Sequence, residues 1–535
     1  MLKKDLKEKI SRRLADKYGV LPEFAVSTPP SGVGGDYAVN LPMILAKKAG
    51  VNPKQLAADI AVELSSLPEI KRASALGGFV NIEIENDYLF GVVGRFDEPS
   101  PSEPKRILIE FVSSNPTGPL HIGHGRCAAI GDSLARLYEY LGAKVEREYY
   151  VNDAGNQIKI LSASVAARIR ELDGRGSPSD FPENGYKGEY IYDIARKAVA
   201  AGVVDPGIFA RDIIMEETRD DLAGFRVKMD TYFSETSLLP RVDAMLRDFI
   251  SRGLAYENDG ALWFSALSET SAEVDGEKEE RVLRKRTGEL TYFASDIAYH
   301  ADKYSRGYDE IIDVWGADHH GYVARIKNSV KALGLDASKL KIILYQLVSL
   351  KRAGKKVAMS TRAGEFVTLR EIVGEVGADA ARFFLLARAP ASPVEFDVDL
   401  AKKHSSENPV FYVQYAHARI SSVFAEAARR GYRVPAEGKT IDLACLSGDE
   451  AERDLAKSIA TLGDTFELCA REYTAHHITA HLLEIARRLH NFYEKCRVLS
   501  DDKDMAASRL DLLSAARRAI KLGLSVLGVE APDKM

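Results

Sequence analysis

The sequence predicts a multidomain α/β protein, in which a Rossmann-like parallel-sheet core follows an α+β amino-terminal domain and precedes an all-α carboxyl-terminal domain. Three observations predict this class. The 535 residues are too many for one hydrophobic core. A strand–helix–strand pattern occupies residues 107–151, and apolar residues at helical spacing run from Asn408 to the end. We predict domains at 1–100, at 101–390 with insertions at about 165–285, and at 391–535.

The first hundred residues combine two helical patterns with one β-like segment. The opening "MLKKDLKEKISRRLADKYG" carries charge in every turn, which is typical of an amphipathic helix and not of a secretory signal. The segment "GGFVNIEIE" places Phe79, Val80, Ile82 and Ile84 behind a Gly-Gly turn. The stretch "FDEPSPSEPKR" then has the composition of a linker, so we place a boundary near residue 100.

The core begins with the apolar run "ILIEFV", which is interrupted only by Glu110. A continuous apolar run of this length is expected for a strand that is covered on both faces. The helical pattern from Cys127 ends at Gly142, and "KVEREYYV" supplies the next strand. Ligands of such βαβ units bind beyond the carboxyl ends of the strands, where "SSNPTGPLHIGHGR" lies.

Later segments continue the same pattern. Strand-like runs occur in "VWGADHHG" and "IILYQLVSL", and "TLRE" at Thr368 to Glu371 forms a capping box that opens another helix. From Asn408 onward the sequence has few strand signals, which indicates the helical domain.

Composition limits the class of protein and its compartment. Apolar residues make up 46% of the chain, with no run near the ~18 apolar residues that a membrane span needs. The four cysteines lie far apart without a Cys-x-x-Cys pair, which argues against a zinc ribbon and fits a reducing cytoplasm. The net charge of −5 gives no general attraction to nucleic acid, so such a partner would need local basic faces.

The loop from Leu120 to Gly125 is a candidate ATP site. A helix that begins at a glycine-rich loop presents backbone N–H groups to phosphate, and His121 and His124 add further donors. The glycines would let a base or sugar approach the backbone. The alternative is a glycine-rich turn whose histidines only cap helix N–H groups. Neither the P-loop pattern nor the dinucleotide fingerprint occurs in the chain.

These residues resemble a known family. "HIGH" (His121 to His124) is identical to the first signature of class I aminoacyl-tRNA synthetases, and "AMSTR" (Ala358 to Arg362) resembles the second. Seven further stretches are similar to bacterial arginyl-tRNA synthetase, and the resemblance runs from "GDYAVNLPMILAKKAG" near the amino end through the carboxyl-terminal helices, so it covers nearly the whole chain. The seven stretches are "EFVSSNPTGPLHIGHGR", "YYVNDAGNQI", "GELTYFASDIAYH", "VWGADHHGYVARIK", "AGEFVTLREIV", "GADAARFFLL" and "ENPVFYVQYAHARI".

The resemblance implies arginine–tRNA ligation with ATP and Mg²⁺, activation that needs bound tRNA(Arg), no protein-bound structural metal, and a monomer. It implies roles for four sets of residues. Expected to be catalytic are His121, His124, Arg362 and Lys356; to bind ATP, Leu120, Gly123, Gly125, Met359 and Ser360; to bind arginine, Glu110, Asn115, Tyr292, Asp296, Asp318 and His319; and to bind tRNA, Tyr412, Tyr415 and Arg419.

Two of these assignments have alternatives. A carboxylate such as Glu110 is costly inside an apolar strand without a cationic partner, and an ion pair with an arginine of the protein would satisfy it as well as a substrate would. The aromatic residues Tyr412 and Tyr415 suit base stacking, but could equally belong to the core of the anticodon-binding domain. The amino-terminal domain resembles the module that contacts the tRNA elbow.

The second signature departs from the family pattern. Ala358 and Thr361 stand where lysines are usual, and Gly118 occupies the place of a lysine that some arginyl enzymes carry before the first signature. We expect Arg362 and either Lys355 or Lys356 to supply the missing charge. The alternative is that these cations are only solvated charges of a hairpin.

The remaining expectations concern metals and rival functions. His476, His477 and His481 are expected to be solvated histidines of a helix, because no further ligand is in register. A different nucleotidylyltransferase with the same histidine loop, and a catalytically silent tRNA-binding relative, remain alternatives. Editing is not expected, since a pocket built for a charged group rejects analogues that lack it.

Overall fold

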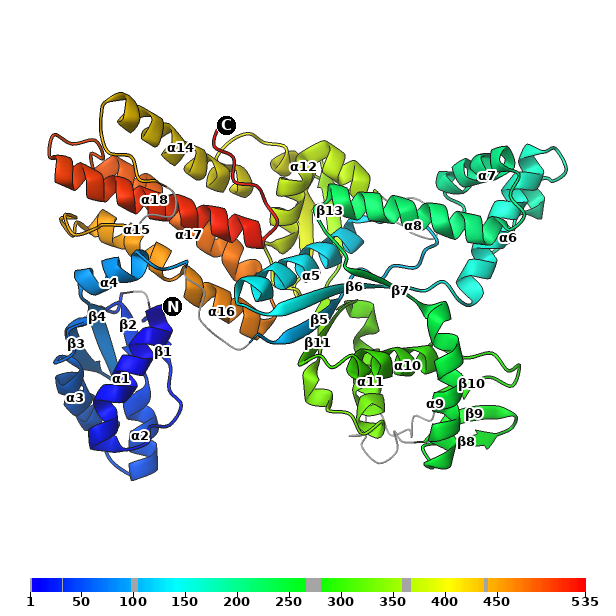
Figure 1. Cartoon of the computed structure of the whole chain (residues 1–535), viewed down its shortest axis with the longest axis horizontal. Helices are drawn as coiled ribbons and strands as arrows, with labels where there is room; N and C mark the ends of the chain where they lie inside the picture. The colour runs from blue at the N-terminus through cyan, green and yellow to red at the C-terminus, as the bar shows by residue number, and fades with distance from the viewer. Residues whose placement is uncertain (1, 31, 98–103, 266–280, 358–366, 437–440) are drawn as a thin grey trace.

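The computed structural model describes residues 2–30, 32–97, 104–265, 281–357, 367–436 and 441–535. Along the chain it forms an amino-terminal α+β domain, a central parallel-sheet domain with helical and β insertions, and a carboxyl-terminal helical domain (Figure 1). This is the predicted fold class. Within the described ranges, no helix is long and apolar enough to cross a membrane.

The amino-terminal domain packs helices on an antiparallel sheet of order β1-β2-β4-β3. Helix α1 buries one face through Leu2, Leu6, Ile10 and Leu14, which recur every four residues. The predicted Gly-Gly turn joins β3 to β4. The elements are α1 (Leu2–Tyr18), β1 (Val26–Ser27), β2 (Tyr37–Val39), α2 (Leu41–Ala49), α3 (Pro53–Leu64), β3 (Ile70–Leu76), β4 (Phe79–Ile84) and α4 (Asn86–Val93).

The core is a five-stranded parallel sheet of order β12-β11-β5-β6-β7. The predicted βαβ unit is confirmed, because β5 and β6 are parallel neighbours joined by α5. The elements are β5 (Arg106–Glu110), α5 (Ile122–Tyr140), β6 (Lys144–Val151), β7 (Thr231–Ser234), α10 (Tyr292–Ser305), β11 (Glu310–Gly316), η3 (Ala317–His319), α11 (His320–Ala332), η4 (Ala337–Lys339) and β12 (Leu340–Tyr345).

Two insertions extend from the core. One is a helical unit and the other is a small antiparallel sheet of order β10-β9-β8 beside α9 (Figure 1). They comprise α6 (Asn156–Leu172), η1 (Pro178–Asp180), α7 (Glu189–Ala201), α8 (Pro206–Gly224), η2 (Glu235–Leu238), α9 (Leu239–Ser251), β8 (Ala255–Asn258), β9 (Ala261–Phe264) and β10 (Arg281–Arg284).

The run "IILYQLVSL", which the sequence presented as one strand-like segment, is divided between two sheets. β12 stays in the core sheet, whereas β13 joins a second sheet of order β14-β13-β15. The chain leaves the first sheet at Gln346, whose carbonyl accepts a hydrogen bond from Arg126 at 2.7 Å. The elements here are β13 (Val348–Arg352), β14 (Lys355–Val357), α12 (Leu369–Leu386), β15 (Val394–Asp397) and α13 (Val398–Ala401).

Helix caps mark the start of the carboxyl-terminal half as expected. Thr368 and Glu371 form the predicted capping box of α12, and the side chain of Asn408 caps α14. Arg382 of α12 is fully buried and binds Asp132 of α5 at 2.6 Å. The helical domain comprises α14 (Pro409–Arg429), α15 (Glu450–Ala460), α16 (Leu462–Glu472), α17 (His476–Lys495) and α18 (Lys503–Val526).

The first and last domains are joined by a partly buried ion cluster. Asp36 accepts hydrogen bonds from Arg453 at 3.0 and 2.6 Å and from Lys457 at 2.8 Å. Although burial raises the pKa of this carboxyl, bonds from Arg453 and Lys457 lower it to about 2. The amino-terminal domain is therefore attached to the helical domain by α15 (Figure 1).

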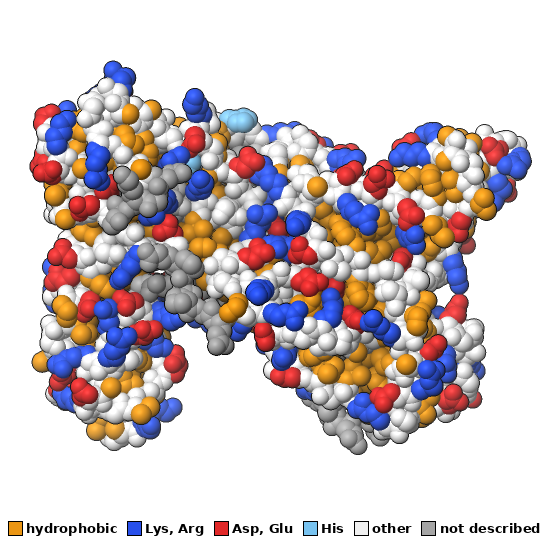
Figure 2. All heavy atoms as spheres, viewed as in Figure 1, with side chains coloured by type: hydrophobic (Ala, Val, Ile, Leu, Met, Phe, Trp, Pro, Cys, Tyr) orange, Lys and Arg blue, Asp and Glu red, His pale blue; other side chains and the backbone are white. Residues whose placement is uncertain are grey.

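The surface shows no segregation of charge on the face drawn in Figure 2. Lys and Arg side chains alternate with Asp and Glu, and a wide notch separates the amino-terminal domain from the lobe that contains α9 to α11. Bulk charge therefore does not identify a nucleic-acid surface on this face.

Candidate active site

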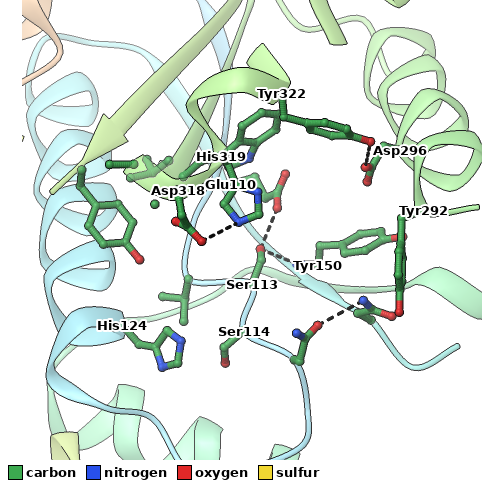
Figure 3. A pocket seen from close by; sticks show the side chains of 18 of the residues that line it. Glu110, Ser113, Ser114, His124, Tyr150, Tyr292, Asp296, Asp318, His319 and Tyr322 are labelled. Atoms are coloured by element: carbon green, nitrogen blue, oxygen red, sulfur yellow. Dashed lines mark hydrogen bonds and ion pairs between the residues drawn. The ribbon is translucent and has the colours of Figure 1, made fainter. Parts of the chain in front are cut away.

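A cavity of about 1430 Å³ opens at the carboxyl ends of the core strands. This is the edge at which ligands of open α/β sheets bind. All six residues predicted to bind arginine line it, together with His121, His124 and Gly123. The six are Glu110, Asn115, Tyr292, Asp296, Asp318 and His319. In Figure 3, His124 lies on one side of the cavity and Tyr292 and Asp296 lie on the opposite side.

The chain enters the cavity through a strained turn. Directly after β5, Val112 and Ser113 have φ angles of 70° and 41°, in the left-handed region that β-branched residues rarely adopt. The Ser113 hydroxyl donates to Glu110 Oε1 at 2.7 Å, and the backbone N–H of Val112 donates to the sulfur of Cys127. Such strain persists only where surrounding contacts hold it, and it is typical of functional sites.

The two histidines cap α5 reciprocally. His121 Nδ1 accepts the backbone N–H groups of Gly123 and His124 at 3.1 and 3.3 Å, and His124 Nδ1 accepts the N–H of His121 at 3.3 Å. The rings stack with centroids 3.7 Å apart. The capping role that the sequence left as an alternative is therefore real, and the rings line the cavity as well.

Burial determines the protonation of the two histidines, and capping determines which ring nitrogen carries the proton. Burial lowers the pKa of His121, while burial and the neighbouring His121 lower the pKa of His124 to about 3. Both rings are therefore neutral at pH 7, and because each Nδ1 accepts hydrogen bonds, each proton resides on Nε2. This end of the cavity offers neutral N–H donors, which suit phosphate oxygens.

Glycines of this loop have packing roles. A Cβ on Gly125 would lie 2.7 Å from Leu369 Cδ1, and one on Gly123 would lie 2.8 Å from the His121 ring. Gly125 and the fully buried Leu120 do not line the cavity. At Gly125 the structure supplies a reason other than ligand approach, namely close contact between α5 and α12.

Two carboxylates face the opposite end, one partly buried and one buried. Asp296 Oδ2 accepts a hydrogen bond from Tyr322 at 2.6 Å, and Glu235 is only 5% exposed. Burial raises the pKa of Asp296, and burial together with the charge of Asp296 raises that of Glu235. Among the described residues, neither carboxylate makes an ion pair. Such a pair is costly unless a ligand cation neutralises it.

Glu110 does have a cationic partner. Lys303 Nζ lies 2.6 Å from Glu110 Oε2, so the protein cation is a lysine of α10 and not an arginine. Asp318 and His319 lie on η3, with side chains 80% and 58% exposed. Sequence reasoning did not single out three further lining residues, Glu235, Tyr322 and Arg325.

Lys355 and Lys356 are the predicted cations of this region that lie among the described residues, and they do not line the cavity. Met359, Ser360 and Arg362 lie outside the described residues. The Lys356 side chain on β14 is 73% exposed, and its Nζ is 4.0 Å from Glu395. Of the described residues that line the cavity, Arg325 of α11 is the one Lys or Arg.

The predicted tRNA-binding residues lie apart from this cavity, on α14. Tyr412 is half-buried and Tyr415 is 42% exposed, with ring centroids 5.0 and 6.1 Å from His490. The Arg419 guanidinium lies 4.8 Å from the Tyr493 ring centroid. A second cavity of about 560 Å³ is lined by Tyr412, Arg487, Arg488, His490 and Lys495, among others.

The three histidines of α17 are not simply solvated, which corrects the expectation. His481 is largely enclosed and bonds Thr465 and the Ser458 carbonyl, because α17 turns this face toward α15 and α16. His477 pairs with Glu472 at 3.0 Å. No group of three His, Cys, Asp or Glu positioned for a metal ion was found in the described part of the chain.

The fold and cavity define a class I aminoacyl-tRNA synthetase, in which the HIGH loop joins the first core strand to its helix. Comparison with known families specifies it further. The arginyl tRNA synthetase N terminal domain matches residues 1–84, the class I (R) catalytic domain matches 93–177 and 209–388, and the DALR anticodon binding domain matches 413–535. The chain belongs to the arginyl-tRNA synthetase family.

Individual relatives agree with this assignment. The arginine–tRNA ligase of Nitratidesulfovibrio vulgaris is 43% identical, with 96% of each chain covered, and that of Carboxydothermus hydrogenoformans is 42% identical over 98% of this chain and 97% of its own. The Thermus thermophilus arginyl-tRNA synthetase structure shares the fold with a TM-score of 0.79 and 22% identity, with all of both chains covered.

Proposed function

We propose that the chain ligates arginine to tRNA(Arg) in two steps. The arginine carboxylate attacks the α-phosphorus of ATP in line, so that a C–O–P bond forms and pyrophosphate leaves. A hydroxyl of the terminal ribose of tRNA then attacks the arginyl carbonyl, and AMP leaves. One observation supports this most: a single cavity has neutral imidazole donors at one end and two carboxylates without a described ion-pair partner at the other.

The acidic end would receive the guanidinium. A planar guanidinium presents forked donors that match carboxylates, and Asp296 and Glu235 would each gain the opposite charge that the described protein does not provide. Tyr292 would flank this group, while Glu110 and Asn115 would meet the α-ammonium and carboxylate end. Asp318 and His319 would complete the cavity at the end of β11.

The histidine end would receive ATP. The Nε2–H groups of His121 and His124 and the N-terminus of α5 would contact phosphate oxygens, and Gly123 would allow close approach. Mg²⁺ would be held chiefly by phosphates and water. Leu120 and Gly125 would support the loop by packing, and Met359 and Ser360 would join the site from the second signature.

The cation that neutralises pyrophosphate has several candidates. Arg362 and either Lys355 or Lys356 follow from the sequence, and Arg325 follows from its place in the cavity wall. We expect Arg362→Ala to slow adenylate formation much more than it weakens arginine binding, in a pre-steady-state measurement. If Arg362→Ala has the wild-type rate and Arg325→Met does not, the role passes to Arg325.

The tRNA would contact both ends of the chain. Tyr412, Tyr415 and Arg419 carry aromatic and basic groups on one helix, as base stacking and phosphate contact require. The amino-terminal domain, held by Arg453 and Lys457, would contact the tRNA elbow. The protein would act as a monomer.

The test is ATP–pyrophosphate exchange with each amino acid, with and without tRNA. Exchange specific to arginine and dependent on tRNA supports the proposal. Exchange with a different acid would identify another nucleotidylyltransferase, and its complete absence would identify a silent tRNA-binding relative.

A further inference from the structure

Beneath the cavity lies a buried cluster of four ionisable groups, which we call the floor cluster: Glu110, His300, Lys303 and Asp313. Lys303 and Asp313 are fully buried, and His300 and Glu110 are 3% and 6% exposed. Glu110 and Asp313 are register partners on the neighbouring parallel strands β5 and β11. Two carboxylates are thus placed side by side in the interior, where their mutual repulsion is strong.

Helix α10 supplies the compensating charge. Lys303 Nζ lies between the two carboxylates, 2.6 Å from Glu110 Oε2 and 2.7 Å from Asp313 Oδ1. Its ammonium group also lies 4.3 Å from the ring centroid of Tyr299. One lysine therefore holds both strands of the pocket floor to the helix that carries Asp296.

The hydrogen bonds of His300 join β11 to α10. Nε2 lies 3.0 Å from Asp313 Oδ2 and Nδ1 lies 2.7 Å from the backbone carbonyl of Asp296. Both ring nitrogens therefore have fixed partners, and the ring holds the Asp313 carboxylate in place beside Lys303.

Glu110 connects the floor cluster to the strained turn. Its second oxygen accepts the Ser113 hydroxyl, which in turn accepts the backbone N–H of Tyr150 at 3.1 Å. The Glu110 carboxylate is therefore oriented from both sides, yet each oxygen retains lone-pair capacity for another donor. Glu110 lines the cavity, whereas Lys303 and Asp313 do not.

We infer that Lys303 and His300 are positioning residues that keep Glu110 ionised and aimed into the cavity, so that it can accept the α-ammonium group of arginine. This inference rests on the proposed function and deepens it. Without Lys303, two adjacent buried carboxylates would share a proton, and Glu110 would become a neutral acid that binds a cation weakly. The affinity for the amino acid thus depends on a lysine that does not line the cavity.

The groups that face Glu110 limit the interpretation of a pH experiment. They come from four elements: Lys303 and Tyr299 of α10, Asp313 of β11, Cys127 of α5 and Tyr150 of β6. Burial raises the pKa of Glu110, and the Lys303 ammonium opposes that rise. The pKa values of Cys127, Tyr150 and Tyr299 are raised, so these groups stay neutral near pH 7.

The test uses the full chain with tRNA and measures arginine-dependent ATP–pyrophosphate exchange. We expect Lys303→Met to raise the KM for arginine by at least about tenfold, with the KM for ATP within about twofold of wild type. The arginine KM of this variant should fall more steeply with rising pH than that of wild type, because without Lys303 the pKa of Glu110 is raised further and its ionisation adds to the wild-type pH dependence.

A charge-balanced double variant separates electrostatics from packing. Lys303→Met with Asp313→Asn removes one charge of each sign, so the arginine KM should recover part of the loss. Arg382→Met is the matched control, because it removes an equally buried cation from Asp132, in a pair between α12 and α5 that does not line the cavity. Its arginine KM should stay near wild type when rates are corrected for folded protein.

The outcomes are distinguishable. An unchanged arginine KM in Lys303→Met, or equal losses for arginine and ATP with no recovery in the double variant, would overturn the inference. If Lys303→Met does not fold, His300→Gln takes its place, and it should raise the arginine KM in the same direction. If wild-type protein shows no arginine-dependent exchange, the proposed function itself has failed.

Discussion

The two ends of the large cavity differ in their electrostatics: one carries neutral rings and the other carries acidic groups. At the start of α5, His121 and His124 are neutral rings that satisfy one another and the helix N-terminus, so this end is complete without a ligand. At the other end, Glu235 is buried and Asp296 partly buried, and neither acid has an ion-pair partner among the described residues. The histidine end is pre-organised, whereas the acidic end is stable only with a bound cation or bound protons.

The largest effect should come from neutralising the acidic end. We expect Asp296→Asn to reduce kcat/KM for arginine on the order of a thousandfold, since a buried ion pair loses one partner. Because an unpaired buried charge disappears, thermal unfolding of the free protein should move to higher temperature. Exchange kinetics and calorimetry measure the two effects. Asp259→Asn, at an exposed side chain outside the cavity, is the control, and a similar loss there would remove the distinction.

The next effect separates capping from chemistry at the histidine end. Asparagine caps helices well but lacks the Nε2–H of His121, so His121→Asn should retain stability and slow adenylate formation about a hundredfold. His121→Ala should show the same slow step and lose about 1 kcal/mol of unfolding free energy as well. Single-turnover kinetics and urea unfolding measure these quantities. Wild-type rates in the asparagine variant would leave the histidine as a cap alone.

A change of pH should act on one end only. Because the pKa values of Glu235 and Asp296 are raised, acidification from about pH 8 to about pH 5.5 protonates them before ordinary carboxyls, and the arginine KM should rise up to about tenfold per unit. The ATP KM should stay flat, since His124, with a pKa of about 3, remains neutral.

The same two acids have the opposite effect on stability. In the free protein their folded-state pKa values exceed the unfolded ones, so the native state binds more protons, and their contribution to stability increases as pH falls. Asp296→Asn should flatten both profiles. A parallel rise of the arginine and ATP KM values on acidification would contradict this difference between the ends.

The smallest effect concerns the packing that supports the histidine loop. We expect Gly125→Ala to cost about 1–3 kcal/mol of unfolding free energy, because the new Cβ overlaps Leu369. Adding Leu369→Ala should make the Gly125 substitution nearly neutral in urea unfolding. The arginine KM should not change in either variant, and a change would show that the two ends are coupled through α5.

Local sequence patterns predicted much of the fold and the histidine end of the cavity. The apolar run before Glu110, the helical period after Cys127 and the capping box at Thr368 are short-range features, and each produced the expected element. The histidines and the predicted arginine-binding residues were placed around one cavity because their motifs follow parallel strands or open helices at one edge of the sheet.

The rest depends on contacts between distant residues. Glu235 opens a short 3-10 helix with no motif around it, so no local signal marked it. Lys303 and His300 occupied ordinary positions of an amphipathic helix, and the ion pair of Glu110 joins residues 193 positions apart. A single sequence shows that Glu110 needs a cation, but only the fold identifies which one.

The attachment of the amino-terminal domain has a consequence for how the chain is made. Asp36 leaves the ribosome 417 residues before Arg453, its bidentate partner. At common elongation rates of about 5–20 residues per second, that carboxylate waits roughly 20 to 80 seconds in water before its counter-charge is synthesised. The contact that attaches the small domain to the helices can therefore form only after α15 has been synthesised.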